Sequence, residues 1–399
     1  MEVQKKNSYC EPQEIAVLIS QTLPSDPGLQ TIKLGQSFKN TTNAYKFYWF
    51  LGILDAVVKE GTTVIDAEDI ACRMICSVWY PVHYFRLRFG ALDQLSESAR
   101  SFKDTLKIPV QTKEDKLFQL LKQHAEPKKK SELNISKFLR YVPYRFLSPW
   151  IKDESNAAVI QASENFSANG ALYMLCKEGG RLKVRVHPQW VPYLKRNYEI
   201  LRSFALWSLT KFVQASNPNV PNISSKLVRP ENRESLARQT KFWKTVMKGG
   251  PVKSIYTGEE LPLNKFALDH FLPWSFVAHD LLWNLTPIEN SINSSKSDKL
   301  PDLKFLDSLV MQHKHALNYL IETQIDEKSL NGLPGKEYEG TLEKLLIKKF
   351  PILEDYSSLG LTALDIAWKP GNVLKEKFTN TFVPLEQIAR DMGFEDWKF

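Results

Sequence analysis

The stretch that decides the fold is residues 256–301, YTGEELPLNKFALDHFLPWSFVAHDLLWNLTPIENSINSSKSDKLP. Residues 266–270 are predicted to form a short strand that ends in Asp269-His270, and residues 282–286 a second strand after a loop. Residues 289–297 are predicted to form a helix that contains Asn293. The order strand, loop, strand, helix lets an Asp-His pair at the end of a strand face an amide side chain on the helix.

These side chains suit the hydrolysis of a phosphodiester. Asp269 and Asn293 offer two hard oxygen ligands for Mg²⁺ or Mn²⁺, and Mg²⁺ keeps waters and phosphate oxygens in the rest of its shell. His270, neutral near pH 7, is suited to take a proton from an attacking water. The bound ion would stabilise charge on the scissile phosphate and the leaving oxygen.

The stretch resembles the HNH (ββα-metal, or His-Me) endonuclease finger, and it is most similar to the HNH module of the RNA-guided CRISPR effector nucleases. The likeness is carried by Tyr256, Thr257, Gly258, Asp269, His270, Pro273, Asn284, Asn293, Lys296, Ser297, Asp298 and Pro301. The resemblance implies that Asp269 and Asn293 bind the metal and that His270 is the general base. It also implies that Asn284 holds the loop and orients the histidine, and that Lys296 contacts a phosphate.

Outside this stretch the sequence contains neither a second nuclease half nor room for guide-binding lobes. The resemblance therefore implies a stand-alone HNH protein of the kind found in bacterial restriction and antiphage defence systems. Many HNH fingers hold a structural zinc with cysteine pairs, but Thr257 stands where a cysteine often follows the tyrosine, and no cysteine follows Cys176. We expect no structural zinc, and expect the finger to be held by packing of Phe266, Leu268, Phe271, Trp274, Trp283 and Leu285.

Other polar residues in and near the stretch are given structural interpretations. His279 and Asp280 lie in the loop between the strands and are interpreted as shaping it, with a substrate or metal role as the alternative. Glu289 is interpreted as capping or lining the helix. His313 and His315 lie in a downstream helix and are interpreted as structural.

Positive charge is concentrated in the middle of the chain. The net charge is −1 over residues 1–100, +15 over residues 101–250 and −6 over residues 251–399. A basic block of this kind is typical of a surface that binds phosphates, although a solvated surface explains it too. We therefore predict nucleic-acid contacts in this region.

Two elements are candidates for these contacts. Residues 173–178 and 181–187 are predicted to form a β-hairpin around Gly179-Gly180, with three basic side chains on one face: Arg181, Lys183 and Arg185. A helix is predicted over residues 231–248, with basic residues near one side of it: Arg238, Lys241, Lys244 and Lys248. A solvated face remains the alternative for the hairpin.

The predicted fold is mainly α with small β elements. A helical N-terminal domain covers residues 1–130, a basic nucleic-acid-binding region with the hairpin covers 131–250, the HNH finger covers 251–310, and a helical region covers 311–399. Helices are predicted near residues 14–22, 47–58, 66–79 (with Pro81 stopping or kinking the helix), 191–215, 303–323, 341–349 and 384–392. Residues 128–130, a run of three lysines, are predicted to be a linker or a phosphate-touching loop.

The sequence predicts a metal-dependent endonuclease that nicks or cuts duplex DNA. The alternatives are a ribonuclease that uses the same site and a DNA-binding effector subunit without activity of its own. No apolar run approaches the ~20 residues that span a bilayer, so we expect a soluble, cytoplasmic protein without a membrane partner. The N-terminal helical domain is a candidate surface for a protein partner or for homo-oligomerisation.

Overall fold

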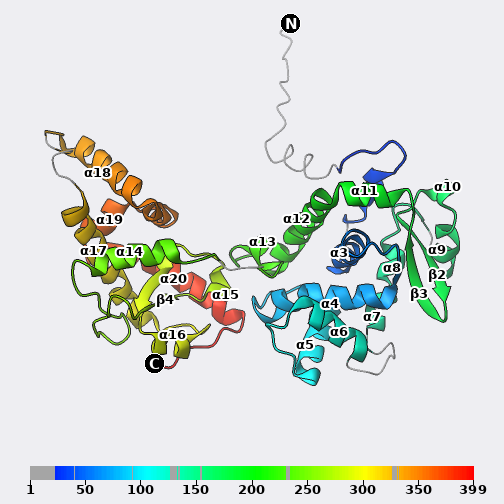
Figure 1. The fold of residues 1–399 in the computed structure, drawn as a ribbon, viewed down its shortest axis with the longest axis horizontal. Coiled ribbons are helices and arrows are strands. Elements are labelled where there is room, and N and C mark those ends of the chain that lie inside the picture. The colour runs from blue at the N-terminus through cyan, green and yellow to red at the C-terminus, as the bar shows by residue number, and fades with distance from the viewer. Residues whose placement is uncertain are drawn as a thin grey trace, which may run out of the picture. The chain divides into compact units, whose positions relative to one another are not determined.

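The structure, a computed structural model, describes residues 23–39, 41–91, 93–125, 133, 135–152, 155–230, 234–325, 330 and 332–399 (Figure 1). The helix predicted near residues 14–22 and the lysines at 128–130 lie outside these ranges. The chain divides into two compact units, Met1–Pro218 with Ile223–Arg229, and Asn219–Asn222 with Pro230–Phe399. The sequence predicts four regions. In the structure the hairpin belongs with the N-terminal helices, and the lysine-rich helix near residues 237–247 belongs with the finger.

The N-terminal unit is mostly helical. Its helices are α2 (Thr31–Gln36), α3 (Tyr45–Val58), α4 (Ala67–His83), α5 (Gln94–Leu106), α6 (Glu114–His124), α7 (Ser136–Leu139), α8 (Val142–Arg145), α9 (Asn156–Ser163), α10 (Phe166–Asn169), α11 (Trp190–Arg196), α12 (Tyr198–Ser216) and α13 (Ile223–Lys226). The aromatic helix predicted at residues 47–58 is confirmed as α3, and it is buried on almost every side, as expected of a helix that is apolar all round.

Two helices of this unit differ from their predicted bounds. α4 continues past Pro81 and ends at His83, so the proline neither stops it nor defines its end. The single helix predicted over residues 191–215 is interrupted at Asn197, whose ψ of 19° is outside the helical range. The Asn197 side-chain amide donates to the carbonyl of Tyr193 at 3.0 Å, which satisfies an acceptor at the end of α11.

The predicted hairpin is confirmed as β2 (Tyr173–Glu178) and β3 (Arg181–Val186). Gly179 and Gly180 have φ values of 57° and 78°, which a two-residue turn of this kind requires and which cost a glycine little. A third strand, β1 (Val64–Asp66), pairs antiparallel with β3 and was not predicted, because three residues are too few to show strand periodicity.

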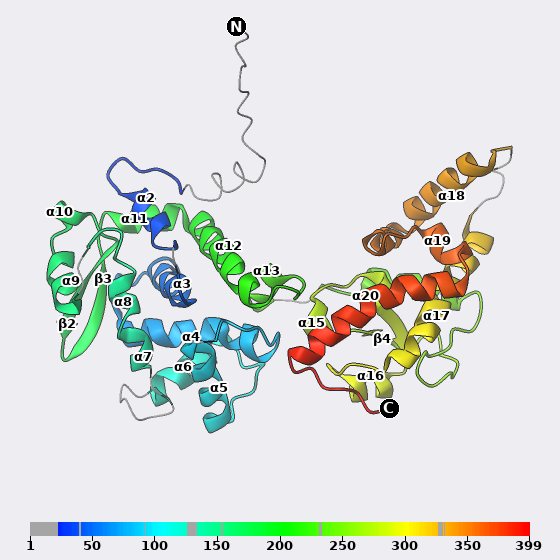
Figure 2. The same cartoon turned by 180° about the vertical axis from the view of Figure 1, so that it is seen from behind.

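The C-terminal unit surrounds the finger with helices. Its elements are α14 (Ala237–Met247), β4 (Ala267–His270), α15 (Trp274–Val277), η1 (Leu282–Asn284), β5 (Leu285–Ile288), α16 (Asn290–Lys296), η2 (Leu303–Phe305), α17 (Leu306–Gln324), α18 (Gly335–Lys349), η4 (Pro351–Leu359), α19 (Ala363–Trp368) and α20 (Gly371–Asp391). α17 and α20 lie against each other (Figure 2). One continuous apolar core joins these helices to the finger.

Four helices of this unit also differ from their predicted bounds. The helix predicted over residues 303–323 begins at Leu306 as α17, and residues 303–305 form η2. α14 begins at Ala237, later than the predicted start at residue 231. α18 begins at Gly335 instead of residue 341. α20 extends over 21 residues with Pro384 inside it, because its buried face packs against the core along its whole length. Among the described residues, no helix is long and apolar enough to cross a membrane.

Candidate active site

The finger is a two-stranded hairpin followed by a short helix. β4 and β5 pair antiparallel, with Asp269 opposite Thr286 and His270 opposite Leu285. α16 starts two residues after β5 ends. Residues 282–284, predicted as the start of the second strand, form a 3-10 turn instead, so β5 begins at Leu285. Strand, loop, strand and helix therefore occur in the predicted order.

His270, at the end of β4, is held by a carboxylate. Its Nε2 lies 2.7 Å from Oδ1 of Asp280, and the two side chains are only 12% and 20% exposed. A carboxylate oxygen accepts hydrogen bonds, so Nε2 carries a proton and donates a hydrogen bond to Asp280. In the neutral ring the other nitrogen, Nδ1, is then a proton acceptor.

Asn284 fixes the backbone that follows His270. Its side-chain amide donates to the carbonyl of Leu272 and its side-chain oxygen accepts from the Leu272 amide, both at 2.9 Å. Its own carbonyl accepts from the amide of Phe271 at 2.8 Å. Asn284 is fully buried, so these bonds join the exit of β4 to the entry of β5. This geometry is what the expected loop-holding role needs.

Asp269 is buried beside a buried cation. The carboxylate is 4% exposed, its Oδ1 accepts from Nζ of Lys296 at 3.0 Å, and its Oδ2 accepts from the hydroxyl of Tyr256 at 3.2 Å. Removal from water raises the pKa of Asp269, and the adjacent Lys296 ammonium acts in the opposite direction. The ion pair with Lys296 offsets part of the free-energy cost of burying this carboxylate.

The position of Lys296 does not fit the phosphate contact that the resemblance implies. A phosphate contact needs an ammonium that solvent and substrate can reach, whereas the Lys296 side chain is 0% exposed. Its Nζ donates to Asp269 and, at 2.7 Å, to the carbonyl of His270. In the structure Lys296 therefore links α16 to the end of β4.

Asn293 shares a face of α16 with Lys296. Residues three apart on a helix lie on one side, so the contact from Lys296 to Asp269 places Asn293 on the side of α16 that faces β4. Its side chain is half-buried.

These residues fit a hard divalent cation. A carboxylate has about four acceptor positions, and Lys296 and Tyr256 use two of those on Asp269. The amide oxygen of Asn293 is the predicted second ligand, and two protein oxygens suit an ion that keeps several waters. Among the residues that the structure describes, no three His, Cys, Asp or Glu side chains are grouped to hold a metal ion. The predicted donor set is of a different kind, since it has one carboxylate and one amide.

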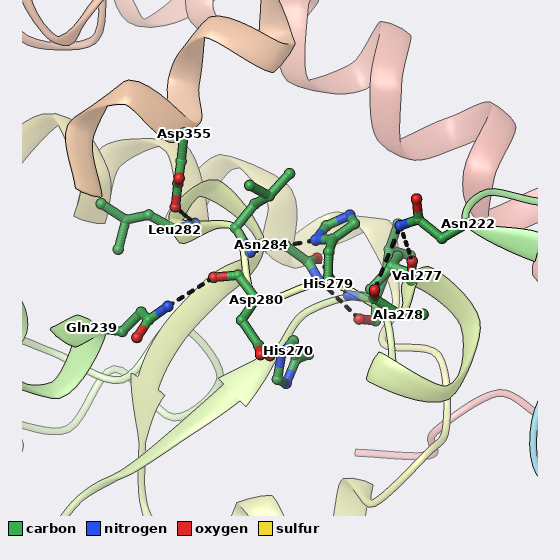
Figure 3. A network of polar contacts seen from close by, with 12 residues as sticks. Asn222, Gln239, His270, Val277, Ala278, His279, Asp280, Leu282, Asn284 and Asp355 are labelled. Carbon is green, nitrogen blue, oxygen red and sulfur yellow. Dashed lines mark hydrogen bonds and ion pairs between the residues drawn. The ribbon is translucent and has the colours of Figure 1, made fainter. Parts of the chain in front are cut away.

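The loop that carries Asp280 is anchored from outside the finger (Figure 3). Gln239 on α14 donates to the Asp280 carbonyl at 3.0 Å, and Asp355 on η4 accepts from the Leu282 amide at 2.7 Å. Asn222 donates to the carbonyl of Val277 at 2.9 Å, next to Ala278, whose φ is +52°. A non-glycine residue with positive φ is uncommon, and these anchors maintain it here.

Aromatic packing also holds the finger in place. The Tyr256 ring lies 5.0 Å from the Phe305 ring and 4.9 Å from the Trp397 ring, measured between centroids. The Trp397 backbone amide donates to the Leu300 carbonyl at 2.7 Å, and its indole donates to the Ser295 hydroxyl at 3.2 Å. Of the predicted packing residues, Phe271, Trp283 and Leu285 are buried, and Phe266, Leu268 and Trp274 are half-buried.

Two acidic residues, Asp280 and Glu289, make contacts that the sequence interpretation did not predict. Asp280 is the only carboxylate in residues 271–284, a signal that could have identified it as the partner of His270. Glu289 accepts from the hydroxyls of Ser254, at 2.7 Å, and Thr257, at 2.5 Å, and so ties the start of the finger to the end of β5. No sequence signal indicated this contact, because it joins residues more than thirty positions apart.

The basic residues of α14 lie on its outer side. Phe242, Trp243 and Val246 are buried against the core, while Arg238, Lys241 and Lys248 are exposed and Lys244 is half-buried. A surface hollow beside them is lined by Ser235, Leu236, Ala237, Thr240, Lys241, Lys244, Thr245 and Lys248. These four basic residues form the α14 row, and the nucleic-acid contact expected of them stays a prediction.

The basic residues of the hairpin are paired with acids. The alternation places Arg181, Lys183 and Arg185 on one face, as predicted. The carboxylates of Glu68, Asp66 and Glu178 lie 4.0, 2.8 and 2.7 Å from them, respectively. This neutralisation weakens the field that a phosphate would meet there, and the predicted DNA contact of the hairpin stays a prediction.

Comparison with known proteins gives one match. Residues 254–302 match the family model described as HNH endonuclease. Searches of the curated proteins and of the solved structures each gave no match to the chain. The matched range contains the hairpin, the Asp269-His270 pair, Asn284 and the whole of α16. Residues 254–302 are therefore an HNH endonuclease domain, and they imply nuclease activity for the chain.

Proposed function

We propose that this protein is a divalent-metal-dependent endonuclease that hydrolyses phosphodiester bonds in DNA. The observation that supports this most directly is the end of β4. There a buried Asp269 stands next to a histidine that a carboxylate holds, and Lys296, which bonds to Asp269, lies three residues after Asn293 on α16.

The side chains divide the reaction between them. His270 Nδ1, the unprotonated nitrogen, accepts a proton from the attacking water as the water oxygen forms its bond to phosphorus. The bond from phosphorus to the leaving oxygen breaks, and that oxygen takes up a proton from solvent. Asn284 keeps the backbone after His270 in place, so that the ring does not move away during the transfer.

Asp269 and Asn293 would hold the metal. When bound, a hard divalent ion such as Mg²⁺ or Mn²⁺ supplies charge stabilisation at the scissile phosphate and the leaving oxygen. Lys296 and Tyr256 orient the Asp269 carboxylate for this task by fixing one donor on each oxygen.

Duplex DNA is the proposed substrate, and RNA is the second candidate, because the site does not itself distinguish the sugar. The exposed lysines of α14 favour a long phosphate backbone over a small phosphate ester. Supercoiled plasmid and a folded RNA, each incubated with Mg²⁺ and with EDTA, test both. We expect nicking of the plasmid, since one base and one metal site act on one strand, and no cutting in EDTA. Cutting of RNA alone would favour the second candidate.

A role in restriction or antiphage defence, and a protein partner or homo-oligomer formed through the N-terminal unit, belong to the same proposal. Their support is the resemblance to stand-alone HNH proteins and the aromatic helical composition of that unit. Protection of cells from phage infection by the intact gene, and not by a gene that encodes His270→Ala, tests the first of them.

The α14 row gives a prediction about binding. Changing Lys241 and Lys248 to glutamate should raise the Kd for duplex DNA at least about tenfold and make the slope of log Kd against log salt shallower by about two, because each lost phosphate contact removes about one unit. Lys348→Glu, an exposed charge reversal on α18, is the matched control and should change neither quantity. Equal salt slopes for the double variant and the unaltered protein would remove α14 from the contact surface.

A further inference from the structure

We propose that Asp280 is a positioning residue for the nuclease reaction: it holds the His270 ring through Nε2, so that Nδ1 is the nitrogen directed at the water. The proposal rests on the proposed function and gives a positioning role to a residue that the sequence interpretation assigned to loop shape, with a substrate or metal role as the alternative. The contact that carries it is the 2.7 Å distance between His270 Nε2 and Asp280 Oδ1.

The His270–Asp280 pair differs from an ordinary ion pair on a surface. Exposed pairs hold their partners loosely and contribute little, because water competes for both groups. Here both side chains are more than three-quarters covered. The imidazole ring has two polar atoms, and one of them is committed to Asp280, so its orientation is fixed by that bond.

The backbone around Asp280 is held as well as its side chain. The Asp280 carbonyl accepts from Gln239, and the second amide after it, that of Leu282, donates to Asp355. Trp283 adds a bond from its indole to the hydroxyl of Ser358 at 2.8 Å. These partners come from α14 and η4, elements outside the matched HNH range. Figure 3 shows Asp280 between Gln239 and His270.

This arrangement explains why the loop adopts an uncommon conformation. Ala278 has a positive φ, which costs a non-glycine residue free energy, and Asn222 and Gln239 hold the backbone on the two sides of it. The result is that the Asp280 carboxylate reaches back to the end of β4. The elements that hold the loop thereby control the geometry of the base.

The first measurement separates positioning from binding. Asp280→Ala should lower kcat for plasmid nicking about 10- to 100-fold, the usual cost of losing a group that orients an active-site histidine, with KM within about twofold of the unaltered protein. Asp280→Asn keeps the shape and one acceptor oxygen and should lose less. Glu339→Ala, an exposed carboxylate on α18, is the matched control and should keep full activity. Gln239→Ala, which frees the Asp280 backbone, should lose activity in the same direction as Asp280→Ala but less.

The second measurement does not depend on activity. In metal-free protein, the Nε2 proton of His270 should give a downfield NMR signal from a hydrogen-bonded imidazole. His270→Gln assigns this signal by its absence. The signal should be lost in Asp280→Ala, or in Asp280→Leu, which also has no acceptor oxygen, if the alanine variant does not fold, while the affinity for Mn²⁺ stays unchanged.

Several results would overturn the proposal. It fails if Asp280→Ala keeps kcat within twofold, or if the Nε2 signal survives the substitution. A parallel loss of Mn²⁺ affinity would instead make Asp280 a metal ligand and would also overturn it. If the unaltered protein cuts neither DNA nor RNA, the nuclease proposal fails by itself, and the NMR signal still decides whether Asp280 holds the ring.

Discussion

Replacing His270 with alanine is expected to lower the rate of strand cleavage by about 10²- to 10⁴-fold, the range that a positioned general base contributes. The ring lies at the end of β4 with Nε2 committed to Asp280, and only Nδ1 remains to accept a proton. Alanine removes the acceptor nitrogen and leaves the apolar core of the C-terminal unit unchanged. His270 lies at the end of the strand and is not one of the residues of that core. Single-turnover nicking of supercoiled plasmid in Mg²⁺ measures the effect.

Binding must stay intact for this result to assign the base. The Kd for plasmid-derived duplex, measured in EDTA so that no cutting occurs, should remain within about twofold of the unaltered protein. His315→Ala, an exposed histidine on α17, controls for the loss of an imidazole and should cut normally. A His270→Ala protein that nicks at the normal rate would remove His270 from the reaction.

The finger could be predicted from sequence because its defining residues are local. The Asp-His pair, Asn284 and Asn293 lie within 25 consecutive residues, and the resemblance that they carry implies two strands and a helix. The role of Asp280 could not be predicted in the same way. Its direction depends on Gln239, which is 41 residues before it, and on Asp355, which binds its neighbour Leu282 from 73 residues away.

Lys296 illustrates a second limit. Its place in the motif suggested an exposed cation, and only the packing of α16 on β4 shows that it is buried against Asp269. The N-terminal unit illustrates a third. Its aromatic helix was recognisable from its own residues, but β1 has three residues and forms only because β3 offers an edge. Pro384 suggested a helix start, whereas the core contacts of α20 continue the helix through it.

Replacing Lys296 with methionine should lower the free energy of unfolding by about 3–5 kcal/mol, because it leaves a buried carboxylate without its cation. Methionine keeps the length and apolar volume of the side chain, so the cost is electrostatic. Urea unfolding in EDTA at pH 7.5 measures it. The double variant Asp269→Asn, Lys296→Met has no buried charge at this position and should recover most of the loss. Lys375→Met removes one partner of the exposed pair with Asp307 and should cost no more than about 1 kcal/mol.

The direction of the pH dependence separates this account from simple loss of packing. Burial raises the pKa of Asp269, and removing Lys296, whose charge lowers it, raises it further. A folded-state pKa above the unfolded value means that the folded protein binds more protons between the two values, so its stability increases as the pH falls through that window. The difference in free energy of unfolding between the unaltered protein and Lys296→Met should therefore be largest near pH 8 and smaller near pH 5. A deficit that is the same at both pH values, or that the double variant does not relieve, would show that Lys296 braces α16 through its hydrocarbon chain and not through its charge.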